Sequence, residues 1–257
     1  MQLKFTRYLV LLLLVGSWVG IKGNAQTLTA DDCTAAPAKT DPPQYGWSHL
    51  SKYCQDDVQI GRPAAGEKRV VFFGDSITAG WHLDESFPGK PYVNRGIGGE
   101  TTSQMLVRFR QDVIDLSPKV VVFLAGTNDI AGNTGPMSLE GIEANLATMV
   151  ELAELHGISV VLASVLPAYD YPWRKGLEPV AKIAALNVWL KSYAAEQGLV
   201  YVDYYSAMQD ERHGLPENLS KDGVHPNQAG YAIMAPLAEQ GITQALHKRP
   251  HLPKITH

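Results

Sequence analysis

Cysteine is scarce in this chain: its 257 residues include only Cys33 and Cys54. Two cysteines are too few for a zinc finger, a cysteine-ligated cluster or a dense disulfide scaffold. An excess of positive charge is also lacking, because 22 lysines and arginines stand against 26 acids and give a formal charge of −4. The chain therefore has no basic field that would gather nucleic acid, and we expect no nucleic-acid partner.

Long hydrophobic runs are missing after the first 25 residues. At the N-terminus, Lys4 and Arg7 precede an apolar run over 8–19, and small residues close the segment at Ala25. This order is typical of a secretory signal peptide, and the run is short for a helix that spans a bilayer. We therefore expect 1–25 to be removed, the protein to be periplasmic or secreted, and the mature chain to have no stable membrane insertion.

The two cysteines are expected to form a disulfide in such an oxidising compartment. Both precede the first predicted strand, so a Cys33–Cys54 bridge would pin the N-terminal arm, and two unpaired thiols are the alternative. Residues 26–67 contain several prolines and glycines with little periodicity. We interpret 26–67 as an irregular arm that wraps the domain formed by 68–257.

A regular alternation of strands and helices begins after Lys68. Short apolar runs predict strands at 70–73, 92–94, 120–124, 158–163 and 200–203. Helical spacing and capping residues predict helices over 101–116, 139–156, 180–196 and 227–246. Pro236 should kink the last of these helices.

Strands that are apolar throughout, each followed by a helix, indicate a parallel sheet covered on both faces. The sequence therefore predicts one α/β domain, a three-layer α/β/α sandwich around a five-stranded parallel sheet. In such sheets the ligand site lies at the carboxyl ends of the strands.

Ser76 directly follows the first predicted strand, in the run Gly74-Asp75-Ser76-Ile77-Thr78. A serine there would begin a helix, with its own N–H free and close to the positive end of the helix dipole. This position suits a nucleophile whose attack creates an oxyanion. A plain N-cap serine is the alternative, because the same pattern is common at helix starts.

An acid and a histidine, Asp222 and His225, lie three residues apart just before the last predicted helix. On one loop the carboxylate can hold one imidazole nitrogen while the other nitrogen accepts a serine proton. A metal site or a surface histidine are the alternatives. A metal site needs at least one more ligand, and no HxH or HxxxH pattern accompanies this pair, so we expect no metal and no cofactor.

An acyl-transfer serine also needs hydrogen-bond donors for the developing oxyanion. Gly98 or Gly99, after the second strand, can present a backbone N–H, and Asn128, after the third, can present its side-chain amide. Glycines also serve turns and asparagines also cap helices, so each signal is weak by itself. Together, four loops at one sheet edge supply a nucleophile, two donors and an acid–histidine pair.

These loops resemble, in order, the sequence blocks of the SGNH (GDSL-type) hydrolases, and the resemblance extends from residue 69 to about residue 246. It implies Ser76 as nucleophile, His225 as base and Asp222 as the residue that orients the base. It also implies an oxyanion hole formed by the Ser76 N–H, Gly99 and Asn128, with Gly99 preferred over Gly98, and a flavodoxin-like fold. The matching blocks are 74–78, 94–101, 126–129 and 222–226.

The stretch 96–101 is most similar to the branch that contains the platelet-activating-factor acetylhydrolase catalytic subunits and many bacterial carbohydrate acetylesterases. The resemblance therefore implies a secreted serine esterase that hydrolyses short-chain, above all acetyl, esters of a carbohydrate or similar polar alcohol through an acyl-enzyme. A lysophospholipase, thioesterase or arylesterase with the same residues is one alternative. A non-catalytic sugar-binding module of this fold is another, although such a module should have lost a catalytic residue.

Aromatic and charged residues gather in the loop after the fourth strand. Aromatic rings beside polar groups suit stacking on a sugar ring, so we expect this loop and Trp81 to rim the site, with ordinary loop packing as the alternative. The predicted substrate contacts are Trp81, Tyr169, Tyr171, Trp173 and Arg174.

Overall fold

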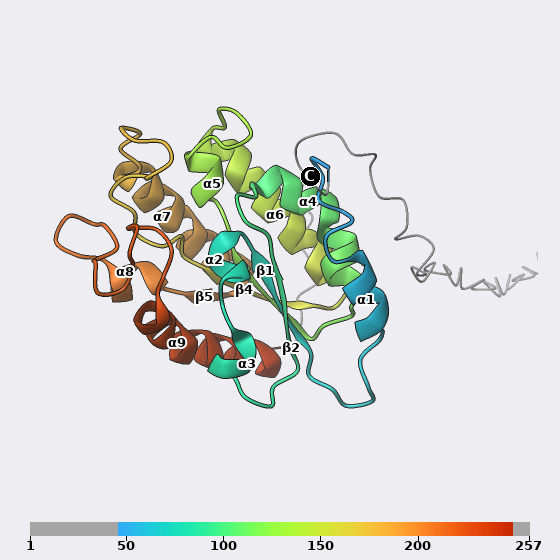
Figure 1. The fold of residues 1–257 in the computed structure, drawn as a ribbon. Helices are drawn as coiled ribbons and strands as arrows, with labels where there is room; N and C mark the ends of the chain where they lie inside the picture. The colour runs from blue at the N-terminus through green and yellow to red at the C-terminus, as the bar shows by residue number, and fades with distance from the viewer. Residues whose placement is uncertain (1–45, 249–257) are drawn as a thin grey trace, which may run out of the picture.

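A computed structural model describes residues 46–248, and its centre is a parallel sheet of five strands in the order β2-β1-β3-β4-β5 (Figure 1). The strands are β1 (Val70–Gly74), β2 (Tyr92–Gly96), β3 (Val120–Leu124), β4 (Ser159–Ala163) and β5 (Val200–Val202). All five predicted strands are present, and the predicted fold class is confirmed.

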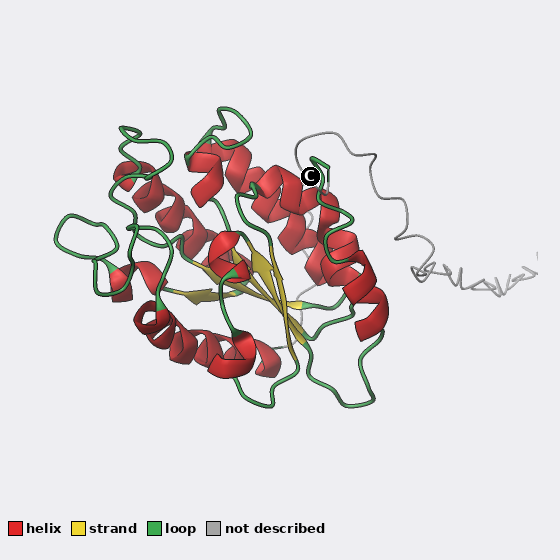
Figure 2. Cartoon of the chain, viewed as in Figure 1, coloured by secondary structure: helices red, strands yellow, loops and turns green. Residues whose placement is uncertain are grey.

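Helices cover both faces of the sheet (Figures 1 and 2). One face is covered by α4 (Thr102–Phe109), the π-helical turn η2 (Arg110–Ile114), α6 (Leu139–Leu155) and α7 (Val180–Gln197). The other is covered by α2 (Ser76–Ala79), α3 (Leu83–Ser86), α8 (Tyr204–Met208) and α9 (Gln228–His247).

Successive residues of β1 pack into the two different cores. Val71 and Phe73 contribute to the core on the α4 side, and Val70 and Phe72 contribute to the core on the α9 side. All four side chains are buried. This two-sided burial explains why the strands are apolar at every position instead of alternating with polar residues.

Helix boundaries differ from the prediction mainly where segments are short. The helices α3, α5 (Thr127–Ile130) and α8 have four or five residues each, too few to show a helical period. The helix predicted over 101–116 is α-helical only to Phe109 and continues as η2. The last helix begins after its N-cap Asn227 and runs through Pro236 to His247.

The described part of the predicted arm is not irregular throughout, because it contains α1 (Cys54–Ile60). Asp57 of this helix pairs with the buried Arg95 of β2 at 2.6 Å, and the Tyr53 hydroxyl donates to the Gly96 carbonyl at 2.5 Å. The helix has only two buried residues, and one of them is the charged Asp57, so hydrophobic periodicity could not reveal it. These contacts attach the arm to the edge of the sheet at β2.

Two expectations concern residues outside the described range. The predicted signal peptide occupies 1–25, and Cys33, the expected partner of Cys54, also precedes residue 46, so both stay predictions. Cys54 itself is buried at the first residue of α1. Across 46–248 no helix combines the length and apolarity needed to cross a membrane.

Candidate active site

The loop after β1 places Ser76 at the carboxyl edge of the sheet. A Cβ on Gly74 would lie 2.2 Å from Thr78 Oγ1 and 2.5 Å from the Leu124 carbonyl oxygen, so only glycine allows α2 to start this close to β3. Asp75 caps α2 by accepting a hydrogen bond from the backbone N–H two residues later, at 2.9 Å. Ser76 is therefore the first residue of α2, as the sequence predicts.

Ser76, His225 and Asp222 form a continuous hydrogen-bonded chain. Ser76 Oγ lies 2.9 Å from His225 Nε2, and His225 Nδ1 lies 2.6 Å from Asp222 Oδ2. The other carboxylate oxygen, Asp222 Oδ1, accepts the backbone N–H groups of His225 at 2.8 Å and Val224 at 3.0 Å. The predicted nucleophile, base and orienting acid therefore lie together.

The charges within the hydrogen-bonded Ser76–His225–Asp222 series favour proton transfer from the serine. Partial burial raises the pKa of Asp222, but the backbone N–H and imidazole of His225 and the N–H of Val224 outweigh it and lower the pKa to about 2. Asp222 is therefore an anion over the whole working range. An anion at Nδ1 holds the proton on that nitrogen, which leaves the lone pair of Nε2 to accept the proton of Ser76.

The second block supplies backbone N–H groups beside the serine. Gly99 has a φ of +76°, a conformation that favours glycine, and a Cβ on Gly98 would lie 3.9 Å from the Cβ of Ser76. Neither the N–H of Ser76 nor that of Gly99 is bonded to any residue in 46–248. Unpaired donors next to a nucleophile are what a developing oxyanion requires.

The orientation of the Asn128 amide follows from a bond made by Trp173. An indole N–H can only donate, so the Asn133 atom 3.2 Å from Trp173 Nε1 is its oxygen. Asn133 Nδ2 then donates to Asn128 Oδ1 at 2.8 Å, which turns Asn128 Nδ2 toward the Glu100 carbonyl at 3.1 Å. The second hydrogen of that NH₂ group has no acceptor in the described part of the chain and is available to an oxyanion.

Asn133 is a candidate functional residue that the sequence did not reveal. Its Nδ2 also donates to the Gly99 carbonyl at 3.1 Å, so one amide joins the two loops with the predicted oxyanion donors. Asp129 joins the same loops elsewhere, because it accepts the N–H and hydroxyl of Thr102 at 3.0 and 2.6 Å. Asn133 lies in a turn after α5, where an asparagine has an ordinary structural explanation.

Trp81 does not rim the site, contrary to the prediction. Its side chain is only 3% exposed, and its ring centroid lies 5.4 Å from that of Phe72 and 5.3 Å from that of Tyr231. The indole N–H donates to Ser86 Oγ at 2.9 Å. Trp81 therefore belongs to the aromatic core on the α9 side, which a local sequence pattern could not distinguish from a surface position.

Two of the other predicted contacts, Tyr169 and Trp173, are on the surface. Their exposed fractions are 55% and 44%. The Trp173 ring centroid lies 6.0 Å from that of His225. Trp173 therefore borders both His225 and, through Asn133, the predicted oxyanion donor Asn128.

The remaining two predicted contacts mainly support the loop. Tyr171 is fully buried, with its hydroxyl 3.0 Å from Thr127 Oγ1. Arg174 Nη1 donates to the carbonyl oxygens of Ala131 and Gly132, at 2.6 Å in each case. Arg174 therefore ties this loop to the turn that follows α5.

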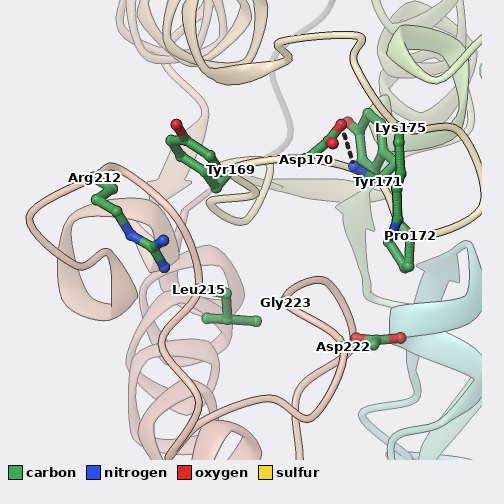
Figure 3. Close-up of a pocket in the computed structure, with 9 residues that line it drawn as sticks. All are labelled: Tyr169, Asp170, Tyr171, Pro172, Lys175, Arg212, Leu215, Asp222 and Gly223. Carbon is green, nitrogen blue, oxygen red and sulfur yellow. Dashed lines mark hydrogen bonds between the residues drawn. The ribbon is translucent and has the colours of Figure 1, made fainter.

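A pocket of about 260 Å³ opens beside Asp222. It lies between the loop 169–175 and the segment 212–223 (Figure 3). The pocket is lined by Tyr169, Asp170, Tyr171, Pro172, Lys175, Arg212, Leu215, Asp222 and Gly223.

In the described residues no group of three or more His, Cys, Asp or Glu side chains is arranged to hold a metal.

Comparison with known families gives a decisive match over residues 72–233, to the model of the GDSL-like lipase/acylhydrolase family. The chain belongs to this family. The matched segment contains all four blocks, so the family resemblance predicted from them is confirmed. Residues 72–233 are therefore a GDSL-like lipase/acylhydrolase domain, and the relatives of the chain include an esterase.

Individual relatives match parts of the chain. The chain is 33% identical to a lipoprotein of Bacillus subtilis over 132 residues, covering 44% of this chain and 54% of that protein. It is 27% identical to an acetylxylan esterase of Geobacillus stearothermophilus over 154 residues, covering 56% of this chain and 68% of that protein. The chain thus spans about half the length of the Bacillus relative.

A solved structure covers more of the chain. A Bacteroides fragilis protein described as an acylhydrolase is 44% identical, with a TM-score of 0.76. The match covers 78% of this chain and 99% of that protein.

Proposed function

We propose that this protein is an exported serine esterase that removes short acyl groups, above all acetyl, from a carbohydrate or a similarly polar alcohol. The observation that carries the proposal is the hydrogen-bonded Ser76–His225–Asp222 series. Beside it, Ser76 N–H, Gly99 N–H and one hydrogen of Asn128 Nδ2 have no acceptor among the described residues. A nucleophile, a base and an oxyanion site beside one another are the requirements of acyl transfer.

The reaction begins when Ser76 Oγ attacks the ester carbonyl carbon and His225 Nε2 takes the serine proton. The carbonyl oxygen becomes negative and accepts hydrogen bonds from Ser76 N–H, Gly99 N–H and Asn128 Nδ2. The bond to the alcohol then breaks, and His225 returns the proton to the leaving oxygen. Asp222 stays ionised and stabilises the imidazolium in between.

Water completes the reaction. The neutral imidazole of His225 takes a proton from water, and the hydroxide attacks the acyl carbon on Ser76. The carboxylic acid leaves as the proton returns to Ser76 Oγ. Each proton and each developing charge is assigned to a side chain or a backbone group, so the proposal includes no metal ion and no cofactor.

Two observations support a polar alcohol and a short acyl group. Tyr169 and Trp173 are half-exposed aromatics near the site and suit stacking on sugar rings. A relative 27% identical to this chain is named an acetylxylan esterase. Lysophospholipases, thioesterases and arylesterases could use the same Ser76, His225 and Asp222, and would differ in the acyl and alcohol groups they accept.

The deciding variant is Ser76→Ala, tested on p-nitrophenyl acetate. Loss of the nucleophile in a serine triad costs on the order of 10⁶ in turnover. Ser206→Ala, at the start of α8, is the matched control and should keep full activity. A covalent organophosphonate should label Ser76 and no other serine. If Ser76→Ala keeps a tenth of the wild-type rate, the proposed mechanism is wrong.

A further inference from the structure

The pocket beside Asp222 carries two cationic side chains that the proposed reaction does not use. Figure 3 shows Arg212 and Lys175 on opposite sides of this pocket, with Leu215 between them and Asp222 at its edge. Tyr169 adds an aromatic face. The pocket therefore combines positive charge, an apolar floor and a ring, which together suit a charged sugar.

The two carboxylates at the pocket are already bonded within the protein. Asp170 accepts the backbone N–H of Gly176 at 3.1 Å with both oxygens and that of Tyr171 at 2.9 Å. These bonds hold the pKa of Asp170 below its usual value. Asp222 uses one oxygen for the imidazole of His225 and the other for backbone N–H groups. Neither acid is placed to neutralise both cations.

The Lys175 ammonium and the Arg212 guanidinium, in contrast, have N–H groups that are not bonded to an acid of the pocket. Lys175 makes no hydrogen bond and no ion pair with the described residues, although its charge contributes to the lowered pKa of Asp170. The guanidinium of Arg212 lies 5.0 Å from the centroid of the Tyr169 ring. Its ion pair with Asp210 is long, at 3.4 Å, and the Arg212 side chain is 68% exposed. An anion in this pocket would therefore meet Lys175, which makes no ion pair with the described residues, and Arg212, whose one ion pair is long.

The proposed reaction would put this pocket on the alcohol side of the bond that is cleaved. In the proposed reaction the carbonyl oxygen points toward Gly99 and Asn128, whereas the leaving oxygen must lie at His225 Nε2 to receive its proton. Asp222 bonds to the opposite nitrogen of the same imidazole and borders the pocket. A unit of the alcohol that extends past His225 would therefore reach this pocket.

We propose that this pocket binds the carboxylate of an acidic sugar next to the acylated one, so that the substrate is an acetylated glycan bearing uronic acid. This inference rests on the esterase function proposed above. The planar fork of Arg212 can bind both oxygens of a carboxylate, Lys175 adds a mobile point charge, and the Tyr169 ring can cover a sugar face.

The test compares purified protein on acetylated xylo-oligosaccharides with and without a glucuronic acid side group. We expect kcat/KM to be about tenfold higher for the acidic substrate, equivalent to roughly 1.4 kcal/mol. Lys175→Glu combined with Arg212→Met should bring the ratio to one or below it. Lys191→Met, an exposed lysine on α7, is the matched control and should keep the wild-type ratio. Added salt should reduce the preference, because exposed charges are screened.

The outcomes separate this inference from the function on which it rests. Equal rates on both oligosaccharides, or a preference that survives in the double variant, would overturn the pocket assignment while ester hydrolysis continued. A stronger preference for acetylated sugar phosphates than for uronates would overturn the assignment of a carboxylate ligand, and the pocket would then be a phosphate site. Failure to hydrolyse p-nitrophenyl acetate or any other ester would contradict the esterase function itself.

Discussion

Arg108 and Glu100 form a fully buried ion pair, in which the guanidinium donates to both carboxylate oxygens. Arg108 Nη2 also donates to the carbonyl oxygens of Arg95 at 2.9 Å and Gly74 at 3.3 Å. The backbone carbonyl of Glu100 in turn accepts the bond from Asn128. One guanidinium thus joins the ends of β1 and β2 to the loop that orients a proposed oxyanion donor.

Replacing Arg108 with methionine should lower the free energy of unfolding by about 3–5 kcal/mol, because two buried acids lose their counter-charge. These acids are Glu100 and Asp112, the second of which lies 2.7 Å from Arg108 Nη1. Urea denaturation measures the change. Lys90→Met breaks a half-exposed pair with Glu239 at 2.7 Å and should cost less than about 1 kcal/mol. A similar small loss in both variants would contradict the structural role of Arg108.

Asn133→Ala should lower kcat while leaving KM nearly unchanged. Asn133 contacts Asn128 and Gly99 and acts through them, so it is a positioning residue. Removal of an oxyanion donor itself costs about 10²–10³ in kcat, and loss of its orientation should cost about tenfold or more. Steady-state kinetics on p-nitrophenyl acetate give both constants, with Asn218→Ala on the surface as control. A change confined to KM would show that Asn133 contacts substrate instead.

Asp75 should make the stability of the protein depend on pH. Its burial outweighs the hydrogen bond from the Ile77 N–H and the nearby charge of His225, and raises its pKa from 3.8 to about 7. The folded state therefore holds a proton that the unfolded chain releases, so stability falls as pH rises from about 4 to about 7. The gap between 3.8 and about 7 bounds this loss at about 4 kcal/mol.

Asp75→Asn should flatten that decline, since an asparagine oxygen can still accept the Ile77 N–H. Urea denaturation at pH 5 and pH 8 compares the variant with the wild type. Asp203→Asn, the same change at the partly exposed N-cap of α8, is the control. Burial also raises the pKa of Asp57 to about 7 and that of Asp129 to about 6, so part of the decline should remain. Equal declines in wild type and Asp75→Asn would exclude this role.

The predictable part of the fold is the part that local patterns encode. The run over 120–124 has no polar residue, so it could be predicted as a buried strand, and Gly74 and Ser76 mark the strand-to-helix turn. Topology then brings the predicted loops together, because the carboxyl ends of parallel strands lie at the same edge of the sheet. Long-range hydrogen bonds leave no such pattern: Trp173 and Asn133 are 40 positions apart. Burial of Trp81 likewise depends on α9, which lies far along the chain.

The exported protein should begin at Gln26 and contain a Cys33–Cys54 disulfide. The described part of the arm already contacts β2 through Tyr53, next to Cys54, so a bridge there would fasten more of the chain to the sheet edge. Intact mass with alkylation, before and after reduction, measures both features. Reduction should lower stability by about 2–4 kcal/mol. Two thiols that react without reductant, or a mass that includes residues 1–25, would refute the corresponding prediction.

We expect the protein to hydrolyse acetate esters with a higher kcat/KM than butyrate or octanoate esters. Trp173 lies beside His225, with ring centroids 6.0 Å apart, and bonds to Asn133 next to the proposed oxyanion donor. Because the ring also reaches the oxyanion loop through Asn133, we expect it to narrow the space for the acyl chain as well as for the alcohol. Against this, each methylene buried in a groove contributes roughly 0.8 kcal/mol, so even a modest groove would reverse the order.

The measurement is kcat/KM for p-nitrophenyl acetate, butyrate and octanoate on the wild type and Trp173→Ala. The variant also loses the bond to Asn133, so the ratio between substrates is informative and the absolute rate is not. We expect the octanoate-to-acetate ratio to rise several-fold when the ring is removed, because the acyl side then has more room. If the wild type prefers octanoate by more than about tenfold, or roughly 1.4 kcal/mol, the chain acts as a lipase or thioesterase and the acetyl preference is wrong.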